Sequence, residues 1–234
     1  MNDAYQIIYA DPPWRFKNWS MKNFAQYGER WQKLEGMPTY PVMTKEDIAA
    51  MPVGDIAARN SLLLMWTTSP MIADGTSDAV MRAWGFVPVT IGFTWVKLNP
   101  SGVGWHFGLG YHTRQNAEYV FIARRGRGLS QIAKDVFSLV LYPRGRHSAK
   151  PPIIRDRIER LYGDVNRVEL FARETVSGWD CYGNEVICSE GTAPLFNYLV
   201  PPIETIIDED EYQGLPIIDT HQESWDLGEQ IRLM

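Results

Sequence analysis

The stretch Tyr5-Gln6-Ile7-Ile8-Tyr9-Ala10-Asp11-Pro12-Pro13-Trp14 decides how this 234-residue chain is expected to fold. Its first six residues are mostly apolar and rich in β-formers, which predicts a short strand over 5–10. Two consecutive prolines cannot continue a central strand, so the chain leaves the sheet directly after Asp11. Ligands of open α/β sheets gather at the carboxyl ends of strands, and this strand therefore delivers a carboxylate and a tryptophan to such a place.

Strands and helices alternate along the rest of the chain. Apolar runs predict strands over residues 61–67, 89–96, 117–123, 136–141 and 167–172. Helix signals fall between them: a capping box at Thr44-Lys45-Glu46-Asp47, a helical segment over 77–84 that stops at Gly85, and a stripe of Ile154, Ile158 and Leu161 that follows Pro151-Pro152 and stops at Gly163. This order predicts an α/β fold, with a mostly parallel sheet and helices on both faces.

Two segments lack regular patterns. Residues 15–43 form a long predicted loop that carries six aromatic residues, and a loop of this length is more often functional than idle. Residues 101–110 contain four glycines and no Gly-Lys-Ser/Thr ending, which excludes a P-loop and is typical of a flexible surface loop. No glycine-rich dinucleotide fingerprint follows any predicted strand.

The net charge of −5 is unevenly distributed. Residues 201–234 hold nine acidic residues and one basic residue, whereas the rest of the chain has a balance of +3. Within this rest, residues 114–150 hold eight basic residues against two acidic ones, which fits either a solvated face or a surface that meets phosphates. We therefore expect a domain over 1–200, followed by an acidic extension over 201–234 that the chemistry does not need.

Composition excludes several classes of protein. The longest apolar stretch is too short to span a bilayer, and the N-terminus lacks the pattern of a signal peptide. The two cysteines, Cys181 and Cys188, have no metal-ligand spacing, so neither a disulfide scaffold nor a zinc site is expected. These features predict an intracellular protein with no metal and no membrane contact.

The residues of the motif Asp11-Pro12-Pro13-Trp14 have a coherent joint chemistry. The amino group of a heteroaromatic ring is a poor nucleophile, because its lone pair is delocalised into the ring. The Asp11 carboxylate and the Pro12 carbonyl can each accept one N–H, which favours a pyramidal nitrogen, and the prolines fix these acceptors in place. Trp14 offers a flat surface for a base. The alternative is a rigid turn with a core tryptophan.

At this point the sequence resembles the N6-adenine methyltransferases related to the 70-kDa subunit of the messenger-RNA adenosine methyltransferase, in the compact form of bacterial and phage members. The resemblance runs from about Ile8 to Glu185. Besides the motif at Asp11 it rests on these segments: Leu63 to Thr68, Trp95-Val96-Lys97, Gly110 to Arg114 with Glu118, His147 to Pro151, Ile158 to Leu161, Glu169 to Arg173 and Gly178 to Glu185.

The resemblance implies a Rossmann-like methyltransferase fold in permuted order, with the catalytic strand first and a cofactor-binding strand late in the chain. It implies S-adenosylmethionine as cofactor, held by side chains that match Asp11, Lys150, Phe171, Arg173, Asn184 and Glu185. It places the substrate-contacting residues at Trp14, Tyr111, His112, Arg114, Gln115 and Glu118. We add Arg124, Arg125 and Arg127 as expected phosphate contacts, because they are clustered between glycines.

The resulting hypothesis is an enzyme that moves a methyl group from S-adenosylmethionine to the N6 amino group of adenine in a polynucleotide, with DNA favoured over RNA. A non-catalytic nucleic-acid-binding subunit is the second hypothesis, although such subunits lose the acid and the aromatic residue that Asp11 and Trp14 supply here. An enzyme that acts on free nucleotides or on another amine is the third. A homo- or heterodimer is left open.

Overall fold

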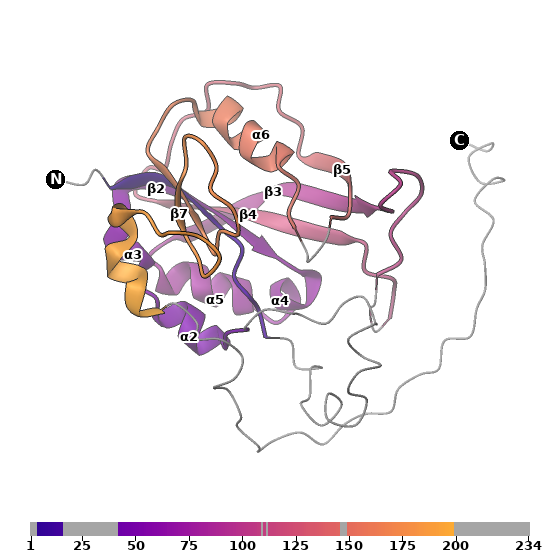
Figure 1. Cartoon of the computed structure of the whole chain (residues 1–234), viewed down its shortest axis with the longest axis horizontal. Coiled ribbons are helices and arrows are strands. Elements are labelled where there is room, and N and C mark those ends of the chain that lie inside the picture. The colour runs from indigo at the N-terminus through magenta and orange to yellow at the C-terminus, as the bar shows by residue number, and fades with distance from the viewer. Residues whose placement is uncertain (1–3, 16–41, 109, 111, 146–148, 199–234) are drawn as a thin grey trace, which may run out of the picture.

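A seven-stranded sheet in the order β5-β3-β4-β2-β1-β6-β7 forms the body of the protein. The structure is a computed structural model that describes residues 4–15, 42–108, 110, 112–145 and 149–198. The strands are β1 (Tyr5–Ala10), β2 (Ala57–Thr67), β3 (Val87–Leu98), β4 (Ala117–Arg125), β5 (Leu139–Pro143), β6 (Arg167–Leu170) and β7 (Asp180–Tyr182). The sheet has the expected α/β character and is shown with its helices in Figure 1.

Strand direction confirms a mostly parallel sheet with one reversed member. β1 pairs in parallel with β2 and with β6, and the pairs β6–β7 and β3–β5 are also parallel. β4 runs antiparallel to both of its neighbours, β2 and β3. The first strand of the chain thus lies beside a late strand, which is the permuted order expected from the resemblance.

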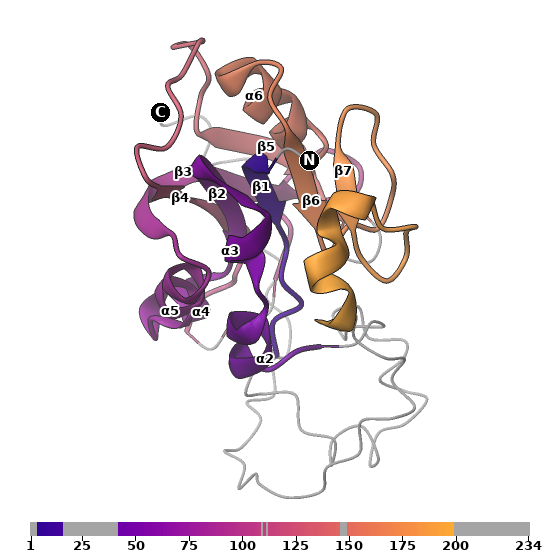
Figure 2. The same cartoon turned by 90° about the vertical axis from the view of Figure 1, so that its left-hand side faces the viewer.

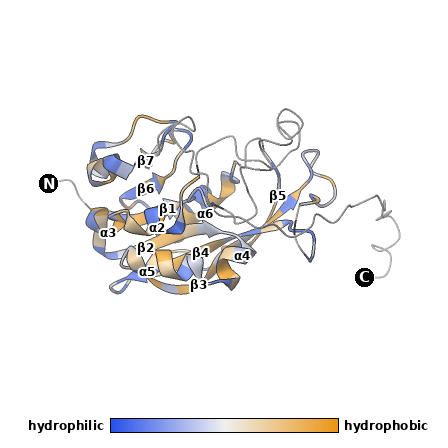
Figure 3. Cartoon of the chain, turned by 90° about the horizontal axis from the view of Figure 1, so that it is seen from below, coloured by the Kyte–Doolittle hydropathy of each residue, from blue (hydrophilic) through white to orange (hydrophobic). Residues whose placement is uncertain are grey.

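Helices cover both faces of the sheet, as predicted. On one face lie α2 (Lys45–Ala50), α3 (Val53–Ile56), α4 (Ser69–Ala73), α5 (Thr76–Ala83) and the 3₁₀ segment η2 (Glu190–Tyr198). On the other face lies α6 (Ile153–Tyr162), and Figures 1 and 2 show it opposite α2, α4 and α5. Figure 3 shows apolar stretches along β3 and α4.

Alternation along β1 explains why this strand is central. The side chains of Ile8 and Ala10 pack into the hydrophobic core between the sheet and helices α2 to α5, which includes Trp84. Those of Ile7 and Tyr9 pack into the core on the opposite face, between the sheet and α6. All four side chains are almost fully buried. A strand that is buried on both faces needs a continuous apolar run, and 5–10 supplies it.

Some boundaries differ from the expected ones. The last strand was expected to reach Ala172, but β6 ends at Leu170 because Phe171 has a φ of +63°, which no strand accommodates. β5 begins at Leu139 rather than at Val136. The short elements α3, α4 and β7 were not predicted. The Thr44 cap is confirmed, since its Oγ1 accepts a hydrogen bond of 3.1 Å from the Asp47 amide.

Two predicted segments fall in parts of the chain that this structure does not describe. The aromatic segment falls mostly within 16–41, and the acidic extension within 199–234, so the division into a domain over 1–200 and a tail stays a prediction.

Among the described residues, no helix is long and apolar enough to cross a membrane. Cys181 and Cys188 are both thiols.

Candidate active site

The Asp-Pro-Pro-Trp motif is fixed by backbone hydrogen bonds where β1 ends. The Asp11 amide donates to the carbonyl of Leu170 at 3.4 Å, which ties the motif to β6. The Trp14 amide donates to the Pro12 carbonyl at 2.8 Å, and the Met43 amide donates to the Pro13 carbonyl at 2.9 Å. The Pro12 oxygen is therefore already an acceptor, although a carbonyl oxygen has a second lone pair for a substrate N–H.

Trp14 lies in the core, not on an open surface. Its side chain is 6% exposed, and its indole N–H donates to the carbonyl of Trp66 at 3.2 Å. This is the position of the core tryptophan that the sequence left as the alternative. The indole braces the motif against β2, and a stacking role for Trp14 stays a prediction.

Four charged side chains from four parts of the chain, Asp11 among them, meet where β1 ends. The Lys150 Nζ lies 2.9 Å from an Asp11 oxygen and 3.2 Å from Glu118 Oε2. The other Glu118 oxygen contacts the Nζ of Lys97. These side chains are between 14% and 25% exposed. We call Asp11, Lys150, Glu118 and Lys97 the charge cluster. It pairs two carboxylates with two ammonium groups, so that it is neutral as a whole.

Two indole rings form part of the surroundings of the charge cluster. Lys150 Nζ lies 5.3 Å from the ring centre of Trp66, and Lys97 Nζ lies 5.1 Å from that of Trp95. The rings of Trp66 and Trp95 are themselves in edge contact, with their centres 6.1 Å apart. Cation–π contacts of this kind stabilise an ammonium group that has lost part of its water.

The cluster separates the pKa values of its two acids. Burial raises the pKa of Asp11 above its usual range, and the Glu118 charge adds to this rise, while Lys150 opposes it. Glu118 is also buried, but Lys150 and Lys97 together lower its pKa to about 2. A third acid, Glu169 on β6, has its pKa raised to about 7 by burial, against the effect of Arg155. Perturbed carboxyl groups that gather at one strand edge are typical of functional sites.

The expected cofactor residues after β6 and β7 lie in two adjoining turns. The Ala172 amide donates to the Tyr182 carbonyl at 2.9 Å, and an added Cβ at Gly183 would lie 2.1 Å from the Ala172 oxygen. Only glycine permits this approach. An ion pair also joins the two turns, since Arg173 Nε lies 3.7 Å from Glu185 Oε1. Phe171, in its left-handed conformation, contacts the ring of Tyr182 edge-on. Asn184 lies between Gly183 and Glu185 and is exposed.

The segment between β3 and β4 presents aromatic side chains that sequence reasoning missed. Trp105 is 49% exposed and Phe107 is 65% exposed. The Arg114 guanidinium lies over the Phe107 ring at 4.1 Å, and the His106 amide donates to the carbonyl of Lys97 at 2.9 Å. The backbone of this segment thus pairs with the end of β3 that carries Lys97. The signal was present in Gly104-Trp105-His106-Phe107, but the glycines around it indicated only flexibility.

The other expected substrate residues are only partly brought together. Glu118 is inside the charge cluster, and Gln115 accepts a hydrogen bond of 2.8 Å from Ser69 at the start of α4. His112 is exposed. Tyr111 lies outside the described residues.

A family model described as MT-A70 matches residues 5–185. The chain belongs to the MT-A70 family. It is 30% identical over 192 residues to the type II methyltransferase M.MunI of Mycoplasma sp, and the match covers 78% of each chain. It is 26% identical over 195 residues to the N(6)-adenine-specific methyltransferase METTL4 of Homo sapiens, of which it covers 38%. It is also 26% identical over 189 residues to the N6-methyladenosine RNA methyltransferase MTA1 of Cryphonectria parasitica, of which it covers 52%.

Family membership confirms the resemblance and the methyltransferase fold that the sequence predicted. The matched residues include every element of the sheet, from β1 to β7. The chain spans most of the length of M.MunI, but about half or less of METTL4 and MTA1.

The arginines expected at phosphates lie at the far edge of this MT-A70 sheet. β4 runs antiparallel to β2, so Glu118 and Arg124 are six residues and about 20 Å apart along one strand. Arg125 donates through Nη1 to the carbonyls of Gly54 and Ala57, at either end of α3. Phosphate contact by Arg125 stays a prediction. Arg124 and Arg127 are exposed, and phosphate contact by them stays a prediction.

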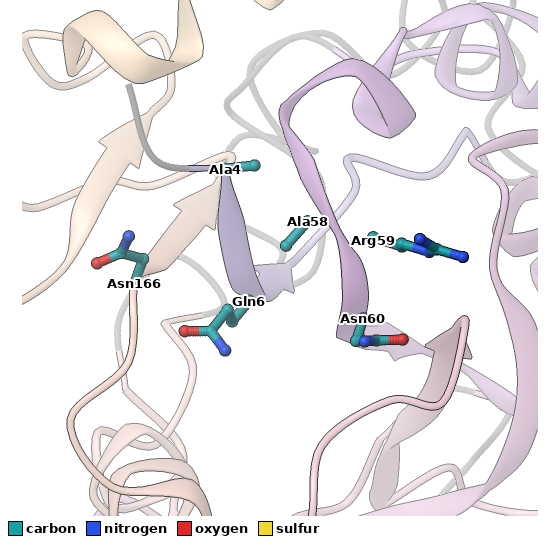
Figure 4. A pocket seen from close by; sticks show the side chains of 6 residues that line it. All are labelled: Ala4, Gln6, Ala58, Arg59, Asn60 and Asn166. Atoms are coloured by element: carbon teal, nitrogen blue, oxygen red, sulfur yellow. The ribbon is translucent and has the colours of Figure 1, made fainter. Parts of the chain in front are cut away.

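A shallow hollow at the same far edge is lined by Ala4, Gln6, Ala58, Arg59, Asn60 and Asn166. Figure 4 shows these side chains at the start of β1 and β2 and just before β6. The hollow contains one charged side chain and no nucleophile or general base, so it does not compete with the charge cluster as a site of chemistry. No group of three metal-ligating side chains gathers among the residues described for this MT-A70 chain.

Proposed function

We propose that this protein is an S-adenosylmethionine-dependent methyltransferase that modifies the N6 amino group of adenine in a polynucleotide, with DNA preferred to RNA. The observation that carries the proposal is the position of Asp11. It follows the central strand of an MT-A70 sheet, is held by a rigid Pro-Pro turn, and contacts the Lys150 ammonium at 2.9 Å.

Asp11 and the Pro12 carbonyl act on the amino nitrogen. An amino group conjugated to adenine is flat and weakly nucleophilic. Asp11 accepts one N–H and the Pro12 oxygen accepts the other, which favours a pyramidal nitrogen with its lone pair directed at the methyl donor. Both acceptors are in place before the substrate binds, so little reorganisation is needed in the transition state. Asp11 must be ionised for this role, and Lys150 favours that form.

The described residues fit the proposed cofactor. S-adenosylmethionine, when bound, supplies an electrophilic methyl group on a sulfonium centre. Its carboxylate matches the buried cation of Lys150, and its ribose hydroxyls match the polar groups of Arg173, Asn184 and Glu185. Phe171 offers a ring beside the adjoining turns after β6 and β7, and its backbone conformation at φ +63° is one that is retained mainly at functional positions.

A polynucleotide substrate is supported by the exposed side chains of the segment between β3 and β4. Trp105 and Phe107 are exposed flat side chains, and Arg114 adds a positive charge at Phe107. Such surfaces bind unstacked bases and the backbone between them. The target adenine must leave a duplex to reach Asp11, which costs a few kcal/mol. The preference for DNA rests on the similarity to the compact type II methyltransferase M.MunI, and RNA is the alternative.

Labelled S-adenosylmethionine tests the proposal. We expect purified protein to label DNA oligonucleotides that contain adenine, and nucleoside analysis by mass to identify N6-methyladenine. Matched RNA should be labelled more slowly. Asp11→Asn is the control for contaminating activity. Labelling of RNA alone would overturn the DNA preference. No transfer to either polymer would favour a non-catalytic subunit, and transfer to free nucleotides only would favour the third hypothesis.

A further inference from the structure

Lys97 is a buried cation to which the proposed chemistry assigns no task. It is the last residue but one of β3, its side chain is 17% exposed, and its Nζ contacts Glu118 Oε1. It also lies over the Trp95 ring. Moving an ammonium group out of water is costly unless it is paired, so a lysine at this depth calls for an explanation beyond packing.

The contacts place Lys97 at the end of a chain of alternating charges. Asp11 contacts Lys150, Lys150 contacts Glu118 through Oε2, and Glu118 contacts Lys97 through Oε1. Lys150 is thus shared between two carboxylates, whereas Lys97 serves only the second of them among the contacts described here. The two oxygens of Glu118 have separate partners, which limits how strongly Glu118 draws Lys150 away from Asp11.

We propose that Lys97 is a positioning residue of the methyl-transfer site, which occupies one oxygen of Glu118 and thereby keeps Lys150 against Asp11. The inference rests on the proposed function for its consequence in catalysis. Lys97 does not touch the reacting nitrogen in this arrangement. It acts through Glu118 and Lys150, and its effect is to hold Asp11 in the ionised form that accepts an N–H.

Removal of Lys97 should change the protonation of Asp11. Without Lys97, Glu118 Oε1 loses its partner, and the Lys150 ammonium turns toward Glu118. Asp11 then keeps its burial and the repulsion of Glu118 but loses its nearest cation. Three further groups interact electrostatically with Asp11. Arg173 lowers the pKa of Asp11. The charge of Asp11 in turn raises the pKa values of Glu169 and Tyr9. Arg173 is the only further cation among them, and it is itself paired with Glu185.

The sign of the pH effect follows from this loss. Burial already raises the pKa of Asp11, and Lys150 opposes that rise. A weaker Lys150 contact raises the pKa further, so the ionised fraction at a given acidic pH falls. The acidic limb of the methyl-transfer rate therefore moves to higher pH. A shift of about one pH unit corresponds to a tenfold lower rate on that limb, because one pKa unit is a factor of ten in protonation.

The test compares Lys97→Met with two matched variants over pH 5 to 9. Lys97→Arg keeps the cation and should retain a profile close to that of the wild type. Lys45→Met removes an exposed lysine that also lies beside a glutamate, Glu46, and should leave the profile unchanged. Lys97→Met should move the acidic limb upward and lower kcat more than it raises KM for the oligonucleotide. Should Lys97→Met not fold, Lys97→Gln carries the same expectation, because it keeps a donor but no charge.

A second measurement does not depend on methyl transfer. ¹³C NMR of carboxyl-labelled glutamate follows the titration of Glu118, with its signal assigned by comparison with Glu118→Gln. In Lys97→Met the Glu118 pKa should rise from its low value of about 2. An unmoved pH–rate profile in Lys97→Met, or an equal shift in Lys45→Met, would overturn the inference. A wild type that transfers no methyl group would instead refute the proposed function, and the Glu118 titration would still decide whether Lys97 holds Glu118.

Discussion

The edge of the sheet at Asp11 and the edge at Arg124 differ in whether their charged side chains are buried and paired or exposed. At the carboxyl ends of β1 and β6, acids and bases are buried together, and burial raises the pKa of Asp11 while Lys150 opposes that rise. At the opposite edge, Arg59, Arg124 and Arg127 are exposed, and Arg59 and Arg127 line shallow hollows. Burying a pair of charged side chains lowers the stability of the fold, and such pairs can take part in chemistry. A single exposed charged side chain has little effect on stability and does not support chemistry in this way. The comparison predicts that the same kind of substitution has large effects at one edge and small effects at the other.

The largest effect is expected for Asp11→Asn at the catalytic edge. The variant keeps the shape of the side chain but removes the charged acceptor. We expect kcat to fall by about 10²- to 10³-fold, the range found when one preorganised hydrogen-bonding group is removed from a transition state. Steady-state methyl transfer measures it, and thermal melting shows whether the fold is kept. Turnover within a few-fold of the wild type would refute the assignment of Asp11.

The second prediction concerns the free energy of unfolding and tests whether ionisation of the buried Glu169 carboxyl group destabilises the fold. The pKa of Glu169 rises from 4.5 to about 7 in the fold, so the folded protein binds a proton that the unfolded chain releases in this window. Stability from this group is present below pH 4.5 and is lost as pH rises toward 7, by at most about 3 kcal/mol. Glu169→Gln should remove this loss. Chemical denaturation at pH 5 and pH 8 checks it, with exposed Glu46→Gln as the control.

A smaller effect is expected for Trp105→Ala, in the segment between β3 and β4. Loss of one stacked base costs about 1–3 kcal/mol, which corresponds to at least a fivefold weaker binding of oligonucleotides. Val103→Ala is the matched control, because Val103 is 76% exposed in the same segment but offers no ring. Fluorescence anisotropy with a labelled oligonucleotide compares the two. Equal losses in both variants would mean that the segment, not the ring, is responsible.

The smallest effect on chemistry is expected from the far edge. Changing Arg124 and Arg127 to Ala together should leave kcat within about twofold, because Arg124 lies about 20 Å from Glu118 along β4 and Arg127 follows in the turn after that strand. If both contact phosphates, as we propose, the slope of log affinity against log salt flattens by about 0.9 for each contact. Binding titrations over a salt series measure it. An unaltered slope would identify them as solvated side chains.

The sequence predicted the parts of the fold where local pattern and burial agree. β1, β2 and α6 have apolar patterns that agree with their burial, so these elements were foreseen, although β2 begins at Ala57 rather than at Ser61. β7 and α3 have only three and four residues, which is too short for a period to be visible. β6 ends because Phe171 has a left-handed backbone conformation, and a phenylalanine in the sequence does not indicate such a conformation.

Sequence reasoning named three members of the charge cluster, but neither Lys97 as a member nor the contacts among them. The resemblance supplied Asp11, Glu118 and Lys150, whereas their mutual contacts depend on the sheet order. The basic run over 114–150 illustrates the limit. It reads as one surface along the chain, but β4 crosses the sheet within it, so that Arg114 and Arg124 fall at opposite edges. The direction of a strand is decided by its partners, and residues 117–125 alone do not contain that information.

The place of β1 in the sheet also bears on the order in which the protein is made. β1 is the first strand to leave the ribosome, but its partner β6 begins only at Arg167. Until then, β1 has β2 on one side and an open edge on the other, and the Leu170 carbonyl that anchors Asp11 does not yet exist. Contacts between residues this far apart in the chain form slowly. A nascent chain that stops before β6 therefore carries the complete Asp-Pro-Pro-Trp motif without the strand that holds it in place.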